Sequence, residues 1–295
     1  MSTISAKLVK ELREKTGAGM MECKKALTEV EGDVEKAIDF LRVRGMASAE
    51  KKAGRATNEG AIAEYISVDS KVGALIEVNC ETDFVAMNEA FTGFVKLLAE
   101  VVAKDNPADA DALMELSVPN RDITIKELFG ETVGKLGENI QVARFERFAL
   151  DGTGALAAYI HGGAKIGIMV EFALDNQASA DAEVFKIYAR DVAMQVAAAN
   201  PVAVNREGFA PEIVEHEKSI YMEQAAESGK PENIQEMMAE GRLKKYFKES
   251  ALVEQAFVKD PDIDIDTYTK RVAKELGDTI EIVAFTRFDL GVGAE

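Results

Sequence analysis

Apolar residues in the first 45 positions recur with helical spacing. Ile4, Leu8 and Leu12 repeat at i, i+4 and i+8, which predicts an amphipathic helix that ends at Thr16-Gly17-Ala18-Gly19. Two further helices are expected, the third with Asp33 as its N-cap. Their apolar positions are Met20, Met21, Cys23, Ala26 and Leu27 in the second and Val34, Ala37, Ile38 and Leu41 in the third. Residues 1–45 therefore predict a three-helix module, and the Lys-, Arg-, Ala- and Gly-rich stretch at 46–59 predicts a partly helical linker.

The remainder of the chain carries one pattern twice. Residues 60–66 (GAIAEYI) match residues 154–160 (GALAAYI) at an offset of 94, and the match runs without a gap to Asn106-Pro107 and Asn200-Pro201. A second pair of similar blocks, residues 136–148 and 276–288, closes each half at an offset of 140. The body is therefore a duplication, which we divide into a core subdomain N (60–150) and a core subdomain C (151–295).

Each repeat predicts a sheet covered by helices. In the first, the strands Ala61–Val68 and Val72–Asn79 are joined by a polar turn. A helix of about four turns, a further helix and a closing strand, Ile140–Phe148, follow. The apolar face of the long helix holds Phe91, Phe94, Leu97, Leu98 and Val101. A hairpin followed by helices and a returning strand is an α+β unit, so the fold class expected is α+β, with two such units side by side.

The larger second offset implies an insertion of 46 residues in the second half, at about 205–251. Pro211 and Pro231 are each expected in the first turn of a helix, with Ser228-Gly229-Lys230 as the turn between the helices. The insertion therefore predicts an antiparallel helical hairpin. Its expected apolar seam places Ile213, Val214, Ile220 and Tyr221 opposite Ile234, Met237, Met238 and Leu243.

Composition and charge narrow the class of protein. The 295 residues are 47% hydrophobic and 29% charged, as in a folded protein of about two domains. A net charge of -17 argues against nucleic-acid binding, although residues 1–58 hold 12 Lys and Arg against 9 Asp and Glu. The acidic body suits a partner with a basic face, and it suits plain solubility equally well. No signal-peptide-like or membrane-length apolar run is present, so a cytoplasmic protein without membrane contact is expected.

No motif for bond chemistry is found. The stretch Gly162–Gly167 places its lysine between glycines rather than after them, so it is not a Walker A loop. Neither Gly-x-Ser-x-Gly nor His-Glu-x-x-His occurs. Cys23 and Cys80 are isolated and are expected to be small core residues, and the two histidines give little support for a metal. We therefore expect no catalytic residues, no metal and no cofactor.

Two surface segments are candidates for binding. In Cys80–Ala86, Thr82 could cap a helix, Asp83 could favour its dipole and Phe84 could lie in the core, which would be a purely structural role. The second repeat, however, has Asp175-Asn176-Gln177-Ala178 at the equivalent place, so the scaffold does not require an aromatic and Phe84 is free to be functional. The other candidate, His161-Gly162-Gly163, reads either as a glycine-rich turn or as a loop that presents His161 to a partner.

Several motifs resemble those of the bacterial elongation factor Ts family. They are Leu8–Arg13 (LVKELR), Thr16–Leu27 (TGAGMMECKKAL), Glu77–Ala86 (EVNCETDFVA), His161-Gly162-Gly163, Ser228–Pro231 (SGKP) and Glu240–Lys245 (EGRLKK). The resemblance covers nearly the whole chain, with two long motifs in the family's order. Some members continue past the last motif with another C-terminal helix, whereas this chain stops at Glu295, and contacts attributed to that helix are not carried over.

The resemblance implies a guanine-nucleotide exchange factor for the GTPase elongation factor Tu. It also implies a ubiquitin-associated-type (UBA-like) three-helix module, a two-part α+β core and a coiled-coil hairpin inserted in the second half. By the same resemblance, Met20 and Met21 grip the GTPase domain. The segment Thr82, Asp83, Phe84 and Val85 disturbs the Mg²⁺ site of the GTPase, and His161, Gly162 and Gly163 contact another domain of it.

Two other classes stay open from the residues. A pure adaptor or chaperone-like protein would use the three-helix module and leave GDP release unaffected. The acid–aromatic pair Asp83-Phe84, present in only one repeat, discriminates against it. An enzyme would need the catalytic constellation that the sequence lacks.

Overall fold

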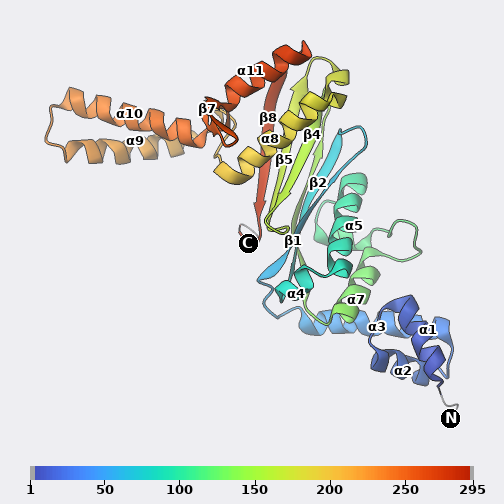
Figure 1. Cartoon of the computed structure of the whole chain (residues 1–295). Coiled ribbons are helices and arrows are strands. Elements are labelled where there is room, and N and C mark those ends of the chain that lie inside the picture. Colours follow the sequence, from blue (N-terminus) through green and yellow to red (C-terminus); the bar gives the residue numbers. More distant parts are fainter. Residues whose placement is uncertain (1–3, 293–295) are drawn as a thin grey trace.

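The computed structural model describes residues 4–292; the ends of the first and last predicted segments, 1–3 and 293–295, lie outside that part. Figure 1 shows an elongated molecule, with three N-terminal helices at one end, sheets in the middle and a helical hairpin at the other end. Helices and small antiparallel sheets alternate, which confirms the α+β class.

The first three helices enclose a small core of their own. They are α1 (Ala6–Thr16), α2 (Met20–Glu29) and α3 (Val34–Lys52). Asp33 caps α3 as predicted, because its side chain accepts a hydrogen bond from the backbone N–H of Lys36 at 3.1 Å. The buried residues of this core are Val9, Leu12, Cys23, Ala26, Leu27 and Ala37.

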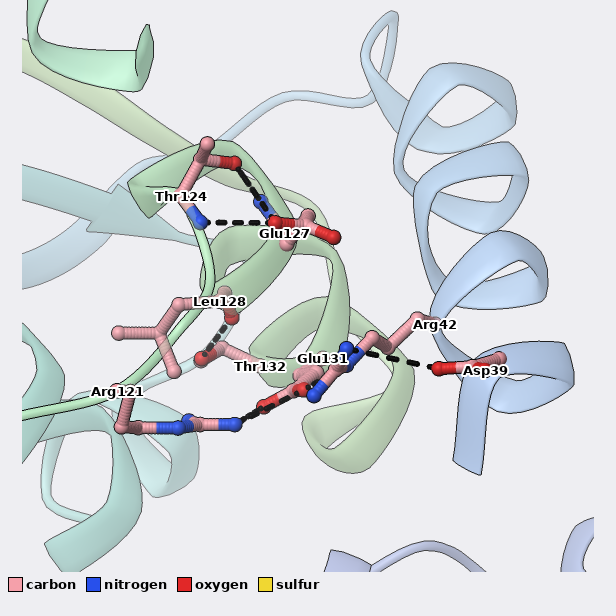
Figure 2. Close-up of polar contacts among 8 residues, drawn as sticks. All are labelled: Asp39, Arg42, Arg121, Thr124, Glu127, Leu128, Glu131 and Thr132. Atoms are coloured by element: carbon pink, nitrogen blue, oxygen red, sulfur yellow. Dashed lines mark hydrogen bonds and ion pairs between the residues drawn. The ribbon is translucent and has the colours of Figure 1, made fainter. Parts of the chain in front are cut away.

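Helix α3 is longer than the sequence pattern predicts. It continues through Lys52, so the first half of the expected linker is helix, and the expected boundary at residue 45 lies inside it. The extra turns pack against α7 (Ile125–Leu136) of the first half, with Gly45 directly against Gly130. Figure 2 shows the polar part of this contact, in which Glu131 of α7 lies between two guanidinium groups. These belong to Arg42 and Arg121, each with a nitrogen 2.9 Å from a Glu131 oxygen.

The two halves have the same fold, as the internal repeat predicts. The first half holds β1 (Glu59–Ile66), β2 (Val72–Cys80), α4 (Asp83–Ala86), α5 (Glu89–Asp105), α6 (Ala110–Glu115), α7 and β3 (Ile140–Ala149). The second holds β4 (Gly154–His161), β5 (Ile166–Leu174), η1 (Gln177–Asp181), α8 (Glu183–Ala199), β6 (Ala256–Phe257), β7 (Asp260–Asp264), α11 (Ile265–Leu276) and β8 (Ile280–Asp289). The antiparallel sheets run β1-β2-β3 and β4-β5-β8.

The two sheets lie face to face, and helices cover their outer faces. The layer between the sheets is made of Ile62, Leu75, Leu156, Met169 and Phe288. Helices α5 and α7 share a core with the first sheet, and α8 and α11 share one with the second. The central strand β2 is buried along almost its whole length, because both of its faces are covered.

The insertion is a pair of helices that projects away from the sheets (Figure 1). The short turns η2 (Arg206–Gly208) and η3 (Leu252–Glu254) flank α9 (Pro211–Ala226) and α10 (Glu232–Ser250). Pro211 is in the first turn of α9 as predicted, whereas Pro231 is the N-cap of α10 and precedes its first turn.

The predicted seam between α9 and α10 is wrong in part. Ile213 and Met237 are exposed, whereas the fully buried positions of the two helices are Ala225 and Ala239. Small residues at the contact let two helices approach closely, so large side chains need not fill the seam. Coiled-coil packing of this pair stays a prediction.

Candidate partner interface

The segment after β2 presents an aromatic side chain to solvent. Thr82 is extended, and its side-chain oxygen accepts a hydrogen bond from the backbone N–H of Val85, which starts the short helix α4 at Asp83. The side chain of Val85 is buried in the core of the first half, but that of Phe84 is 80% exposed. As predicted, Thr82 is the N-cap and Asp83 lies in the first turn of the helix, whereas the structural interpretation that places Phe84 in the core is wrong.

Two acidic residues fix the backbone of this segment. The Glu81 carboxylate accepts a hydrogen bond from the backbone N–H of Asn139 at 2.6 Å, and the neighbouring Arg55 lies 3.3 Å from it. The Glu138 carboxylate accepts three hydrogen bonds, from the backbone N–H groups of Glu81 and Thr82 and from the Thr82 hydroxyl. The sequence analysis missed Glu138, although the repeat carried a signal, since Asp278 occupies the equivalent position in the second half.

Cys80 lies directly beneath the segment as a neutral thiol. Its S–H donates to the carbonyl oxygen of Thr82 at 3.2 Å. Burial, reinforced by the nearby Glu138 carboxylate, raises the pKa of Cys80 to about 12. Burial also raises the pKa of Cys23. Both cysteines are buried, which agrees with the small core residues expected from the sequence.

His161 is the last residue of β4, and Gly162 and Gly163 begin the exposed turn that leads to β5. The φ angles of Gly162 and Gly163 are 63° and 68°, a left-handed conformation that glycine adopts without strain. The imidazole Nδ1 of His161 is hydrogen-bonded to the hydroxyl of Tyr159 at 2.9 Å, which limits the orientation of the ring. The turn therefore holds an aromatic, hydrogen-bonding surface.

This turn lies at the same end of the double sheet as α4. The carbonyl oxygen of Ala164 accepts a hydrogen bond from the backbone N–H of Ile62 in β1 at 2.8 Å. Lys165 forms an ion pair with Glu59 at 3.1 Å, and Glu59 is opposite Cys80 in the sheet ladder. The two candidate segments thus come from different halves of the chain and meet around the start of β1, which Figure 1 shows close to α4.

Met20 and Met21 lie apart from these two segments, at the start of α2. Their side chains are 56% and 74% exposed, while the opposite face of the helix, with Cys23, Ala26 and Leu27, is buried. Two adjacent exposed methionines make an adaptable apolar surface of the kind that protein partners contact. Their position relative to α4 is set by α3, which connects the N-terminal helices to the first half.

The surfaces at Met20, Met21 and Phe84 expose large apolar side chains to solvent. Within residues 4–292, no group of three His, Cys, Asp or Glu side chains is arranged to hold a metal ion. None of the helices described in that range is both long and apolar enough for a membrane span. What the surfaces offer is exposed apolar side chains on a backbone fixed by hydrogen bonds, an arrangement that anchors a protein interface.

Comparisons with known proteins give one consistent result. The family model described as Elongation factor TS matches residues 81–292. A protein named Elongation factor Ts from Clostridium perfringens (strain SM101) is 49% identical over 292 residues, which are 99% of this chain and 94% of the relative. A protein of the same name from Clostridium botulinum (strain ATCC 19397) is 46% identical over 293 residues, with the same coverage.

Proposed function

Because this chain belongs to the elongation factor Ts family, we propose that it is a guanine-nucleotide exchange factor for the GTPase elongation factor Tu in translation elongation. The single observation that carries the mechanism is the exposure of Phe84 on a backbone held by hydrogen bonds. An aromatic side chain in this position is available to a partner without unfolding of the segment.

The physical requirement on such a factor is differential binding. A GTPase holds GDP through backbone amides of its phosphate loop, a lysine and Mg²⁺. A factor accelerates GDP release when it binds the nucleotide-free or metal-free state more tightly than the GDP-bound state. By linkage, GDP weakens the binding of the factor by the same ratio by which the factor weakens GDP. No catalytic residue and no cofactor of the factor takes part.

Within the proposed interface, Asp83 and Phe84 have different roles. The ring of Phe84 wedges into an apolar gap of the GTPase, and the carboxylate of Asp83 competes for polar groups near the Mg²⁺ ion. Thr82 and Val85 keep the pair in place, since one caps the helix and the other is buried beneath it. The segment therefore disturbs the metal and nucleotide site through contact alone.

The other exposed surfaces provide the remaining contacts of the proposed interface. Met20 and Met21 hold the GTPase domain, and His161 with Gly162 and Gly163 contacts a second domain of the same partner. In this proposal neither nucleic acid nor a membrane is a partner.

Stopped-flow release of fluorescent GDP from elongation factor Tu, with and without this protein, tests the proposal. We expect the release rate to increase with the concentration of this protein and then to saturate. Binding without any acceleration of release would overturn the exchange function in favour of a pure adaptor. A rate unchanged at every concentration, without binding, would overturn both.

A further inference from the structure

Glu138 holds the stretch of backbone from which Phe84 projects. It lies between the C-cap of α7 and the start of β3, and its Oε2 accepts the backbone N–H groups of Glu81 at 3.1 Å and Thr82 at 3.0 Å. Its Oε1 accepts the Thr82 hydroxyl at 2.6 Å. Hydrogen bonds that a charged carboxylate accepts are stronger than those between two neutral groups. The last residues before α4 therefore have one preferred position.

The Thr82 hydroxyl connects this carboxylate to helix α4. Its hydrogen is donated to Glu138, and its oxygen faces the backbone N–H of Val85 at 3.4 Å. Helix α4 has only four residues, Asp83–Ala86, and a helix of one turn has no stability of its own. Its direction therefore depends on its N-cap and on burial of Val85, and the orientation of the N-cap hydroxyl depends on Glu138.

The second half of the chain contains the same carboxylate without the aromatic. Asp278 accepts the backbone N–H groups of Asp175 and Asn176, both at 3.2 Å. These residues are equivalent to Glu81 and Thr82, but the residue equivalent to Phe84 is Ala178. The carboxylate is thus a feature of the repeated scaffold, and only in the first half does the backbone that it holds present a large apolar side chain to solvent.

We propose that Glu138 is a positioning residue for nucleotide exchange, which fixes the direction in which Phe84 leaves the surface. The inference rests on the proposed function and extends it, because Glu138 acts through the backbone of Thr82 and need not touch the partner. An aromatic side chain that wedges into a gap loses effect when its backbone can tilt, since the partner must then select the correct orientation from several.

The test compares three variants of the full chain in the fluorescent GDP release assay. Glu138→Ala removes all three accepted hydrogen bonds, and its second-order rate of stimulated release should fall about tenfold. Glu138→Gln keeps an amide oxygen for the two backbone N–H groups and should restore the rate to within about threefold of the unmodified protein. Asp278→Ala is the matched control, with a similar local loss of hydrogen bonds, and its rate should stay within about twofold.

Two further measurements separate positioning from a loss of folding. In Glu138→Ala, the amides of residues 81–84 should exchange their hydrogen faster while the amides of β2 stay protected. Added to the double variant Asp83→Ala/Phe84→Ala, Glu138→Ala should cause little further loss, because a residue that acts only through these two side chains has nothing left to position.

A rate for Glu138→Ala equal to that of Asp278→Ala would overturn the inference, as would a full additional loss in the Asp83→Ala/Phe84→Ala background. If the unmodified protein does not accelerate GDP release, the proposed function fails instead. Faster amide exchange at residues 81–84 would then still report whether Glu138 fixes the segment.

Discussion

Glu77 and Arg144 form an ion pair inside the molecule, with 2.9 Å between Oε2 of the fully buried carboxylate and Nε of the guanidinium. The other carboxylate oxygen accepts the backbone N–H of Gly291 at 2.8 Å. The guanidinium also lies 4.1 Å from the centre of the Phe288 ring. Because Gly291 and Phe288 belong to the end of the second half, this pair joins the two sheets.

The Arg144→Met variant should lose about 3 kcal/mol of unfolding free energy. Removal of one partner leaves the buried Glu77 carboxylate without its compensating charge, which costs more than the pair itself contributes. Urea unfolding followed by circular dichroism measures the change, as a lower midpoint with an unchanged slope.

Glu171→Gln is the matched control for this prediction. Glu171 is equivalent to Glu77 but has Ala284 opposite it in the ladder instead of an arginine, and burial raises its pKa. Its replacement should therefore leave the midpoint nearly unchanged or raise it slightly. A change in Arg144→Met as small as that in Glu171→Gln would show that the arginine is not what compensates Glu77.

Phe84→Ala should slow stimulated GDP release about tenfold or more while the stability of the chain changes by less than about 0.5 kcal/mol. The reason is that the ring is 80% exposed and contributes little to the core. Val85→Ala should do the opposite in the unfolding experiment, with a loss of about 2 kcal/mol, because Val85 is 8% exposed and its methyl groups fill the core.

Phe84→Ala and Val85→Ala together test whether the exposed residue serves nucleotide release and the buried residue serves stability. Release is followed by stopped-flow fluorescence and stability by urea unfolding on the same preparations. Undiminished release with Phe84→Ala would remove the wedge from the mechanism. A large loss of stability in that variant would restore the core role that sequence alone suggested for Phe84.

The Cys80 thiol should be unreactive in the folded protein. With its pKa raised to about 12, the thiolate fraction near pH 8 is on the order of one in 10⁴. Ellman's reagent at about pH 8 should therefore react with Cys80 only after denaturant is added. Fast reaction in the native state would contradict the burial of this group.

The raised pKa of Cys80 also predicts that the protein loses stability as the pH rises above about 9. The unfolded thiol ionises near 9 and the folded one near 12, so the stability contribution is full below about pH 9 and is lost as the pH rises toward 12. Cys80→Ala has no thiol to ionise, and its unfolding midpoint should fall less steeply between about pH 8.5 and 9.5. Parallel curves for the two proteins would contradict the assignment to Cys80.

Much of the fold can be predicted from local sequence patterns, because the internal repeat shows each of them twice. Asn106 and Asn200 both end a helix in the left-handed conformation, and they sit at the offset of 94 read from the sequence. A helix of one turn such as α4 is too short to show a periodic pattern of apolar residues. The exposure of Phe84 could therefore be inferred only because the second repeat has no aromatic residue at the equivalent position. The extent of α3 was missed because the Gly45–Gly130 contact that supports it joins residues far apart in sequence.

The contact between Gly45 and Gly130 yields the last prediction, because it sets how the N-terminal helices are attached. A Cβ at residue 45 would overlap the carbonyl oxygen of Gly130, which belongs to a helix backbone that cannot yield easily. Gly45→Ala should therefore separate α3 from α7, at a net cost of about 1–2 kcal/mol after the higher helix propensity of Ala is counted. Gly134→Ala on the facing helix is the control, since its Cβ would lie at an ordinary 3.5 Å from the Cα of Gly45.

Limited trypsin digestion followed by mass spectrometry reads out this attachment. Lys51 and Lys52 lie in the last turn of α3, where a packed helix resists the protease. In Gly45→Ala these bonds should be cut faster, and in Gly134→Ala they should be cut no faster than in the unmodified protein. Unchanged cleavage in Gly45→Ala would mean that α3 holds its last turns without α7. The orientation of Met20 and Met21 relative to Phe84 would then have to be set by other contacts.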